Sequence, residues 1–464
     1  MEQAYFSLIV WTNDTDMDQF KDMLESIDEQ EYRDFELYIL DNNPTNDIEI
    51  VIKEFFPDIV DKVHYRRLKK KQGCAYAYNI GAHFAEGNQL VYLGQHDRLS
   101  FSTLSALNDK LTEIYDASDK VEDVPCIIYT DHDELIGLDR RNPHFKPDFN
   151  KELFLQTNYI GDFLCISKSL YKKLGTFQEK AKNAYLYEYI LRAAFKKEPI
   201  YHIPSLLYHK RVTEGAMNKE QRAAANFSCK EHLALALHYL RQSGVICEGR
   251  VDQSLKKWHI DYDETSFRRF SGDYMFLRDE KVRLFTRNNA KKMYAILNQP
   301  DVAVVGVRFL GRGFTYDNAG YIFDENGNSY KAFHGQKIFK DTYEGLGSMP
   351  RDVAFVDAGC CMIDAKVYRM LHGFDTRLSG NDALFDFCIR ARKRGFRTVV
   401  LPKCIAINKN RPVVEAENDE EQTAPSNTLL EKHGAIIRKG DSFYNKNLPM
   451  GNDNYILPGT ENEG

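Results

Sequence analysis

The chain has 464 residues, of which 43% are hydrophobic and 28% charged, which is enough to bury roughly two or three cores of a typical domain size. It carries 62 Lys and Arg against 68 Asp and Glu, and the two signs are interspersed, which argues against nucleic-acid binding. The 9 cysteines are scattered without a Cys-x-x-Cys pair, so the sequence suggests neither a zinc site nor a disulfide framework and favours a reducing compartment.

The sequence shows no N-terminal secretion signal and no run of about 18 uninterrupted apolar residues. We therefore expect a cytoplasmic protein with at most peripheral membrane contact. The basic run from Arg66 to Lys71 leaves the inner face of the membrane open as a location. This run could hold a diphosphate or an anionic surface, or it could be a solvated loop face.

The first elements predict a parallel βαβ unit and hence an α/β fold. Phe6 to Val10 is β-rich, apolar residues recur at helical spacing over 20–27, and Phe35 to Leu40 is again β-rich. A polar run beginning with Asp41 follows this second strand. A carboxylate there is well placed to bind the ribose or base of a nucleotide, although ordinary turn residues would look the same.

A buried strand from Gln89 to Leu93 is the next landmark, preceded by predicted helices over 48–56 and 73–85. The polar loop from Gly94 to Arg98, which carries Asp97, follows this strand. In open α/β sheets ligands bind beyond the carboxyl ends of the strands, so the loop is a candidate site, and a simple turn is the alternative.

A second acidic cluster is expected after the strand Cys126 to Tyr129, in Thr130-Asp131-His132-Asp133-Glu134. Carboxylate oxygens are the ligands that hard divalent cations prefer. Gly-rich phosphate loops of the G-x-G-x-x-G and G-x-x-x-x-G-K-[ST] types are absent from the sequence, which argues against Rossmann dehydrogenases and P-loop enzymes.

Taken in order, these parts resemble the inverting family-2 glycosyltransferases, which have the GT-A fold. The resemblance runs over residues 5–211 and is carried by Gln30 to Asn42, by Gly73 with Ala77-Tyr78-Asn79, and by Ala85-Glu86-Gly87. It is most specific for a subgroup that assembles bacterial surface polysaccharides, often rhamnose-rich. The segments that carry this are Tyr129 to Asp133, Phe145 to Phe149, Asn158 to Gly161, His202 to Pro204 and Leu207 to His209.

The resemblance implies a nucleotide-diphospho-sugar donor, a divalent cation (Mn or Mg) and a glycan or lipid-linked glycan acceptor. The residues it implies for the donor are Asp41, Asn43, Asn79, Asp97, Asp131 and Asp133. His96, Asp97 and His209 are the implied metal ligands.

Two departures from the family pattern bear on activity. Where the family has Leu-Asp-x-Asp-Asp, this chain has Leu93-Gly94-Gln95-His96-Asp97, so both outer carboxylates of the metal motif are missing. The family's catalytic base falls at Leu186, which cannot accept a proton. Glu188 is the substitute nearby, although it points about 200° away from position 186 on a helix.

An internal repeat pairs residues 185–192 with residues 383–390, and residues 272–410 resemble the acceptor-side half of another family-2 domain. We predict a GT-A domain over 1–211, a helical connector over 212–271 and a truncated, GT-A-like α/β domain over 272–464. Asp382 is a second candidate base, or a helix cap.

Two functions therefore stay open. The first is an inverting transferase that moves a sugar from a nucleotide diphosphate to a glycan in cell-surface polysaccharide assembly. The second is an inactive pseudo-glycosyltransferase that acts as a scaffold or glycan-binding partner, alongside other glycosyltransferases.

Overall fold

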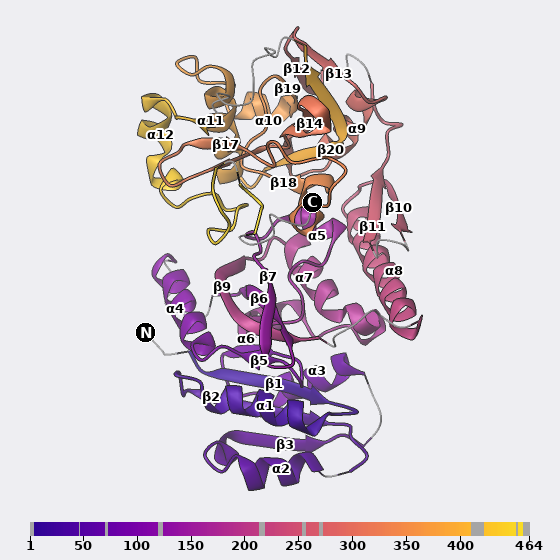
Figure 1. Cartoon of the computed structure of the whole chain (residues 1–464), viewed down its shortest axis with the longest axis vertical. Coiled ribbons are helices and arrows are strands. Elements are labelled where there is room, and N and C mark those ends of the chain that lie inside the picture. The colour runs from indigo at the N-terminus through magenta and orange to yellow at the C-terminus, as the bar shows by residue number, and fades with distance from the viewer. Residues whose placement is uncertain are drawn as a thin grey trace. The chain divides into compact units, whose positions relative to one another are not determined.

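A computed structural model describes residues 4–45, 47–69, 73–118, 124–212, 219–252, 257–268, 272–409, 422–451 and 453–457, and the side chains of 219–227 lie outside this description. The chain forms two compact units (Figure 1). Unit 1 comprises Met1–Phe149, Asn158–Tyr239 and Val251–Lys257, and unit 2 comprises Asn150–Thr157, Leu240–Arg250 and Trp258–Gly464. The domain boundaries expected from the sequence stay a prediction.

The first half of unit 1 is a parallel sheet built as the sequence predicts. Its elements are β1 (Phe6–Thr12), α1 (Met17–Asp28), β2 (Phe35–Asp41), α2 (Asp47–Phe55), β3 (Val63–Arg67), α3 (Cys74–Phe84) and β4 (Gln89–Tyr92). The strands β3, β2, β1 and β4 lie side by side in that order, all parallel. Strands β1 and β2 are apolar on both faces because helices cover the sheet, and Phe20, Leu24 and Ile27 of α1 pack into its core.

The second half of unit 1 extends the same sheet with mixed strand directions. Its elements are β5 (Arg98–Leu99), α4 (Thr103–Asp116), β6 (Ile127–Ile136), β7 (Asp139–His144), β8 (Leu164–Ser167), α6 (Lys168–Leu174), α7 (Tyr185–Phe195), β9 (Ile200–Arg211) and α8 (Lys219–Gln242). The order continues β4-β8-β6-β9-β5: β8 is antiparallel to β4 and β6, β9 is parallel to β6, and β5 is antiparallel to β9. The mixed α/β class is confirmed.

One expectation for this half was wrong. The acidic cluster around Asp131 and Asp133 does not follow the strand, because β6 continues through it to Ile136. Pairing with β9 carries the strand onward, and the two carboxylates lie within it, where histidines of β9 satisfy them.

Unit 2 is built on a 7-stranded sheet. The elements that belong to it are α5 (Lys151–Gln156), β12 (Tyr274–Arg278), β13 (Val282–Leu284), α9 (Asn289–Leu297), β14 (Val302–Leu310), β15 (Tyr316–Asn318), β18 (Arg351–Asp352), β19 (Cys360–Asp364), α10 (Ala365–Met370), α11 (Gly380–Lys393), β20 (Arg397–Asn408) and α12 (Asn427–Ile437). A 3-stranded sheet adds β16 (Tyr321–Phe323), β17 (Ser329–Lys331) and β21 (Gln422–Thr423). Part of the stretch expected as a helical connector instead forms a 2-stranded sheet of β10 (Cys247–Asp252) and β11 (Lys257–Tyr262).

The sheet of unit 2 repeats the second half of unit 1 strand for strand. Its order is β12-β19-β14-β20-β13, and β14 and β20 are parallel while the other neighbours are antiparallel. These are the directions found in β4-β8-β6-β9-β5. Strand β15 pairs with β14 as β7 pairs with β6. Among the described residues, unit 2 has no strands in the places that β1, β2 and β3 take in unit 1.

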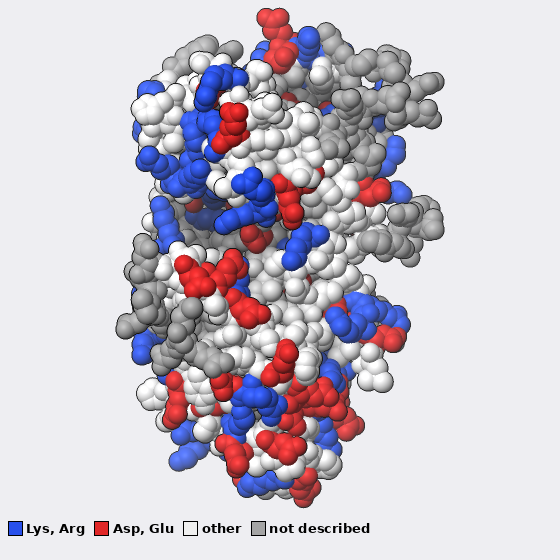
Figure 2. All heavy atoms as spheres, turned by 90° about the vertical axis from the view of Figure 1, so that its left-hand side faces the viewer, with Lys and Arg blue, Asp and Glu red and all other residues white. Residues whose placement is uncertain are grey.

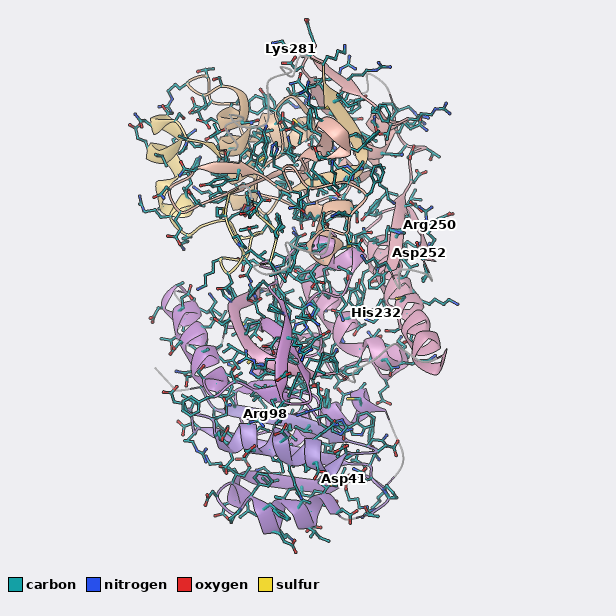
Figure 3. The ribbon with its side chains drawn as sticks, viewed as in Figure 1. Asp41, Arg98, His232, Arg250, Asp252 and Lys281 are labelled. Carbon is teal, nitrogen blue, oxygen red and sulfur yellow. The ribbon has the colours of Figure 1, made fainter. Side chains whose placement is uncertain are left out.

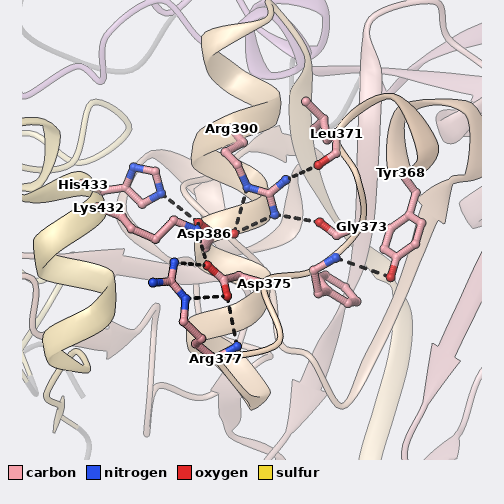
Figure 4. Close-up of polar contacts among 10 residues, drawn as sticks. Tyr368, Leu371, Gly373, Asp375, Arg377, Asp386, Arg390, Lys432 and His433 are labelled. Atoms are coloured by element: carbon pink, nitrogen blue, oxygen red, sulfur yellow. Dashed lines mark hydrogen bonds and ion pairs between the residues drawn. The ribbon is translucent and has the colours of Figure 1, made fainter.

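An equivalent buried ion pair anchors one helix in each unit. In α7, Arg192 contacts Glu188 four residues earlier and donates to the carbonyls of Leu174 and Thr176. In α11, Arg390 contacts Asp386 and donates to the carbonyls of Leu371 and Gly373 (Figure 4). Each carboxylate also accepts from a later helix: Tyr239 of α8 reaches Glu188, and Lys432 and His433 of α12 reach Asp386.

The described ranges contain no helix with both the length and the apolar character needed to cross a membrane. On the face in Figure 2, acidic and basic side chains are mixed over unit 1, as the composition indicates.

Asp386→Asn should lower the free energy of unfolding by about 3–5 kcal/mol at pH 7, because it leaves the Arg390 guanidinium without its buried carboxylate and removes one of the two carboxylates that Lys432 contacts. Burial works to raise the pKa of Asp386, but His433, Arg390 and Lys432 hold it well below its usual range. The stabilisation is therefore present above about pH 4, the unfolded value, and is lost as the pH falls toward the depressed folded pKa. Urea unfolding at pH 7 and at acidic pH measures both effects, with the exposed Asp341→Asn as control. Equal stability of the two variants at pH 7 would contradict the anchoring role.

Candidate functional site

The carboxyl ends of β1, β2 and β4 meet at one edge of the unit 1 sheet. Thr12 and Asp41, the last residues of β1 and β2, are partners in register. Figure 3 labels Asp41 on the sheet of unit 1. The loop Gly94 to Asp97 follows β4, the other neighbour of β1.

Asp41 is a fully buried carboxylate whose oxygens accept four hydrogen bonds. Thr12 Oγ1 donates to Oδ1 over 2.8 Å, and the backbone N and Nδ2 of Asn43 donate to the same oxygen over 2.9 and 2.8 Å. Tyr65 Oη donates to Oδ2 over 2.7 Å. Burial is the main cause that raises the pKa of this phenol, and the hydrogen bond to Asp41 raises it further. A buried carboxylate is stable only when its oxygens accept hydrogen bonds. Asp41 therefore holds Asn43 in a fixed position at this edge of the sheet.

Hydrogen bonds join this edge to the loop after β4. Asn43 Nδ2 donates to Thr15 Oγ1 over 2.9 Å, and Thr15 Oγ1 donates to Gln95 Oε1 over 2.7 Å. Gln95 also bonds the backbone of Asn13 at both its N and its O. Asp41 and the loop that carries Asp97 therefore lie on the same edge, as the sequence predicts.

Asp97 is buried and faces β9. Its Oδ2 accepts a short hydrogen bond from Tyr208 Oη, and its Oδ1 accepts from the backbone N of Arg211 over 2.8 Å. Burial raises the pKa of Asp97, and the charge of Asp162 contributes. Gly94 leaves room for this carboxylate, because a Cβ there would lie 2.1 Å from Asp97 Oδ2.

Asp162 is a second carboxylate on the same face of β9. Lys210 Nζ donates to Asp162 Oδ2 over 2.6 Å, two residues after the Tyr208 that holds Asp97. Residues two apart on a strand share a face, so Tyr208 and Lys210 hold the two carboxylates on the same side of β9. The Asp162 side chain is 51% exposed.

Partial desolvation raises the pKa of Asp162, but the positive charges of Lys210 and Lys146 outweigh this effect and lower the pKa overall. Asp162 is therefore an ionised, solvent-accessible carboxylate next to β9.

The predicted metal ligands are each engaged with protein atoms. His96 Nε2 accepts from the backbone N of Asp16 over 3.1 Å, and His209 contacts Asp133 Oδ1 over 2.6 Å and Ser100 Oγ over 2.9 Å. No group of three or more His, Cys, Asp or Glu within the described ranges could hold a metal ion. These side chains, as they are arranged, do not fit a resident divalent cation.

The remaining predicted donor residues are held inside the unit. Asp131 Oδ1 lies 2.8 Å from His202 Nε2 and accepts from the backbone N of Lys146 over 2.8 Å. Asp133 accepts from Arg140 Nε over 2.7 Å in addition to His209. Asn79 bonds Tyr171 Oη and both backbone polar atoms of Phe177.

The two predicted bases are also engaged. Glu188 is 1% exposed and is held by Arg192 and Tyr239. Asp382 lies in the first turn of α11, and its Oδ2 accepts from the backbone N of Ser426, the N-cap of α12, over 2.8 Å. Asp382 therefore does not cap a helix: it holds the backbone of Ser426, whose own side chain caps α12.

Gln95 lies in the loop that the sequence marks as a candidate site, but the sequence does not single out Thr15, Tyr208, Asp162 or Lys210. Thr15 has the pattern of an ordinary turn residue. Asp162 and Asp97 are far apart in the sequence, and only their contacts with β9 bring them to the same strand.

This is an α/β domain whose polar residues gather at the carboxyl edge of its parallel strands, where ligands bind in such folds. Residues 13–175 match the model of Glycosyl transferase family 2. The match and the strand order support a GT-A type α/β fold for this part of the chain.

Two curated proteins are similar to the chain. The uncharacterized protein y4gI of Sinorhizobium fredii is 21% identical over 97% of this chain and 58% of its own length. The O-antigen biosynthesis protein RfbC of Myxococcus xanthus is 25% identical over 47% of this chain and 16% of its own. The chain thus spans less than two thirds of both relatives. Among solved structures, S. aureus TarS is 15% identical over 51% of this chain and 42% of its own, with a TM-score of 0.38.

Glu188→Gln should lower the free energy of unfolding by about 3 kcal/mol, because Arg192 loses a buried partner. Turnover by the folded fraction should change only a few-fold, since the carboxylate is turned into the protein. Chemical unfolding and donor hydrolysis measure the two effects, and the exposed Glu179→Gln is the matched control. A loss of about two to four orders of magnitude in turnover with stability intact would instead identify Glu188 as the base.

Proposed function

We propose that unit 1 is an inverting glycosyltransferase that moves a sugar from a nucleotide-diphosphate donor to a hydroxyl of a glycan or lipid-linked glycan. The observation that carries the proposal is the single edge that joins Asp41, Asn43 and Gln95 to Asp97, within residues matching a glycosyltransferase family model. We place the reaction in cell-surface polysaccharide assembly. Its support is the similarity to an O-antigen biosynthesis protein.

In this proposal the nucleotide contacts Asn13, Thr15 and Asn43, and the hydrogen bonds from Asn43 to Asp41 hold Asn43 in place. The acceptor hydroxyl attacks the anomeric carbon of the donor sugar, and the bond from that carbon to the diphosphate breaks. The proton of the hydroxyl passes to the carboxylate of Asp162, and the nucleoside diphosphate leaves. Asp162 takes the role that Leu186 cannot play.

The described side chains do not fit the divalent cation that the resemblance implies, so no step above passes through one. Unit 2, in the same proposal, is a truncated second copy of the transferase fold. Its shared strand order, strand directions and Arg390 anchor support this, as does the lack of counterparts to β1, β2 and β3 among the described residues. We assign the chain to the surface-polysaccharide subgroup on the sequence segments that resemble it, with a place at the cytoplasmic side.

The alternative is an inactive pseudo-glycosyltransferase that scaffolds other glycosyltransferases. The observation that favours it is that every predicted metal ligand and both predicted bases are engaged with protein atoms.

Asp162→Asn should lower turnover by about two to four orders of magnitude while donor affinity stays the same, because the amide cannot accept the proton. Release of nucleoside diphosphate from a panel of nucleotide sugars measures the rate, and calorimetry measures affinity. Asp116→Asn, an exposed change elsewhere in unit 1, is the control. Full activity of Asp162→Asn would remove the residue from this role, whereas wild-type protein that neither binds nor hydrolyses any donor would favour the scaffold.

Excess EDTA should leave turnover within about twofold, because the described side chains do not form a cation site. The same donor assay, run with EDTA and then with added Mn²⁺, measures this. Loss of turnover in EDTA that Mn²⁺ restores would contradict the expectation and show that Asp97 and its neighbours rearrange around a metal ion.

A further inference from the structure

Unit 2 contains a cavity of about 870 Å³ that the proposed transfer reaction does not use. It opens where β12 ends, before β19 begins, at the start of α11 and at the end of β20. In the strand correspondence given above, they match the end of β4, the start of β8, the start of α7 and the end of β9 in unit 1, the part that contains Asp97 and Asp162. The volume lies within the usual range of small-molecule sites.

One side of this cavity, which we call the unit 2 cleft, is aromatic. Tyr368 and Phe374 line it, with ring centroids 5.2 Å apart and planes at 79°. Both are partly exposed. Tyrosine and phenylalanine faces offer a large apolar surface at low entropic cost, which suits the C–H face of a sugar ring.

Other lining residues offer planar polar groups. Asp279, Asp357 and Asn381 line the cleft, and carboxylates and amides can bond two neighbouring hydroxyls at once. Asp357 is fixed by Tyr321 Oη over 2.9 Å and by the backbone N of Gly359 over 2.8 Å. Asn381 is fixed by the backbone N of Ala358 over 3.0 Å. Both side chains are thus oriented before a ligand arrives, which lowers the entropic cost of binding.

The charge of the cleft decides between ligand classes. Among its described lining residues, Arg278 is the one basic side chain against the carboxylates Asp279, Asp317, Asp357 and Asp375. Asp317 is paired with Lys331, and Asp375 with Arg377 and Lys432. Burial raises the pKa of Asp357, so the exposed Asp279 is the carboxylate that keeps the cleft acidic. This charge disfavours phosphate or uronate groups and leaves neutral hydroxyls as the complementary partner.

We propose that the unit 2 cleft binds a neutral saccharide, stacked on Tyr368 and Phe374 and hydrogen-bonded by Asp279, Asp357 and Asn381. Among the described residues, unit 2 has no counterparts of β1, β2 and β3, so we expect the cleft to hold the sugar without transferring it. This inference concerns unit 2 by itself and does not require that unit 1 turns over.

The full chain, labelled with a fluorophore, is applied to an array of neutral oligosaccharides and of matched glycans that carry uronate or phosphate. We expect binding to neutral glycans. Asp279→Ala should weaken it about tenfold, since a hydrogen bond to a charged group is lost. Thr376→Trp, which adds bulk at an exposed lining position, should abolish it, and the neighbouring Glu280→Ala should not change it.

Asp162→Asn in unit 1 should bind the same glycans as the wild type, so failure of the transfer proposal and failure of this one give different results. Binding that is confined to anionic glycans, that survives both cleft variants, or that is absent from every neutral glycan would overturn the proposal.

Discussion

The buried charge of Asp41 is the constraint on which the edge of unit 1 depends. A carboxylate with no exposed surface is tolerated only when its oxygens are satisfied, and four hydrogen bonds do this here. Two of them come from Asn43, which in turn holds Thr15 and through it Gln95. The loops after β1, β2 and β4 are thereby fixed to one another before any ligand binds, which is the preorganisation that a binding site needs.

Strand β9 fixes two further carboxylates in the same unit. Tyr208 and Lys210 present their polar groups on one face and hold Asp97 and Asp162. The two carboxylates differ in environment: burial raises the pKa of Asp97, whereas Lys210 keeps Asp162 ionised. We therefore give Asp97 a structural role in the site and propose Asp162 as the carboxylate that accepts a proton.

The sequence predicted the alternation of strands and helices in unit 1, because apolar periodicity and turn residues agree there. It also placed Asp41 and Asp97 on one edge, since parallel strands end together. It did not show that Asp131 and Asp133 lie inside β6, because the histidines that satisfy them come from β9, about 70 residues later. For the same reason the partners of Glu188 and Asp382 were hidden: each is bonded to a helix far along the chain. Local patterns report periodicity, whereas the engagement of a buried polar group is decided by tertiary packing.

Hydrogen–deuterium exchange of the full chain with and without a saturating nucleotide sugar tests the central claim most directly. The account predicts protection of the backbone at residues 13–16, 42–45 and 94–98, the three loops that Asp41, Asn43 and Gln95 tie together. Exchange that is unchanged in these loops with every nucleotide sugar, or protection found only in unit 2, would contradict it.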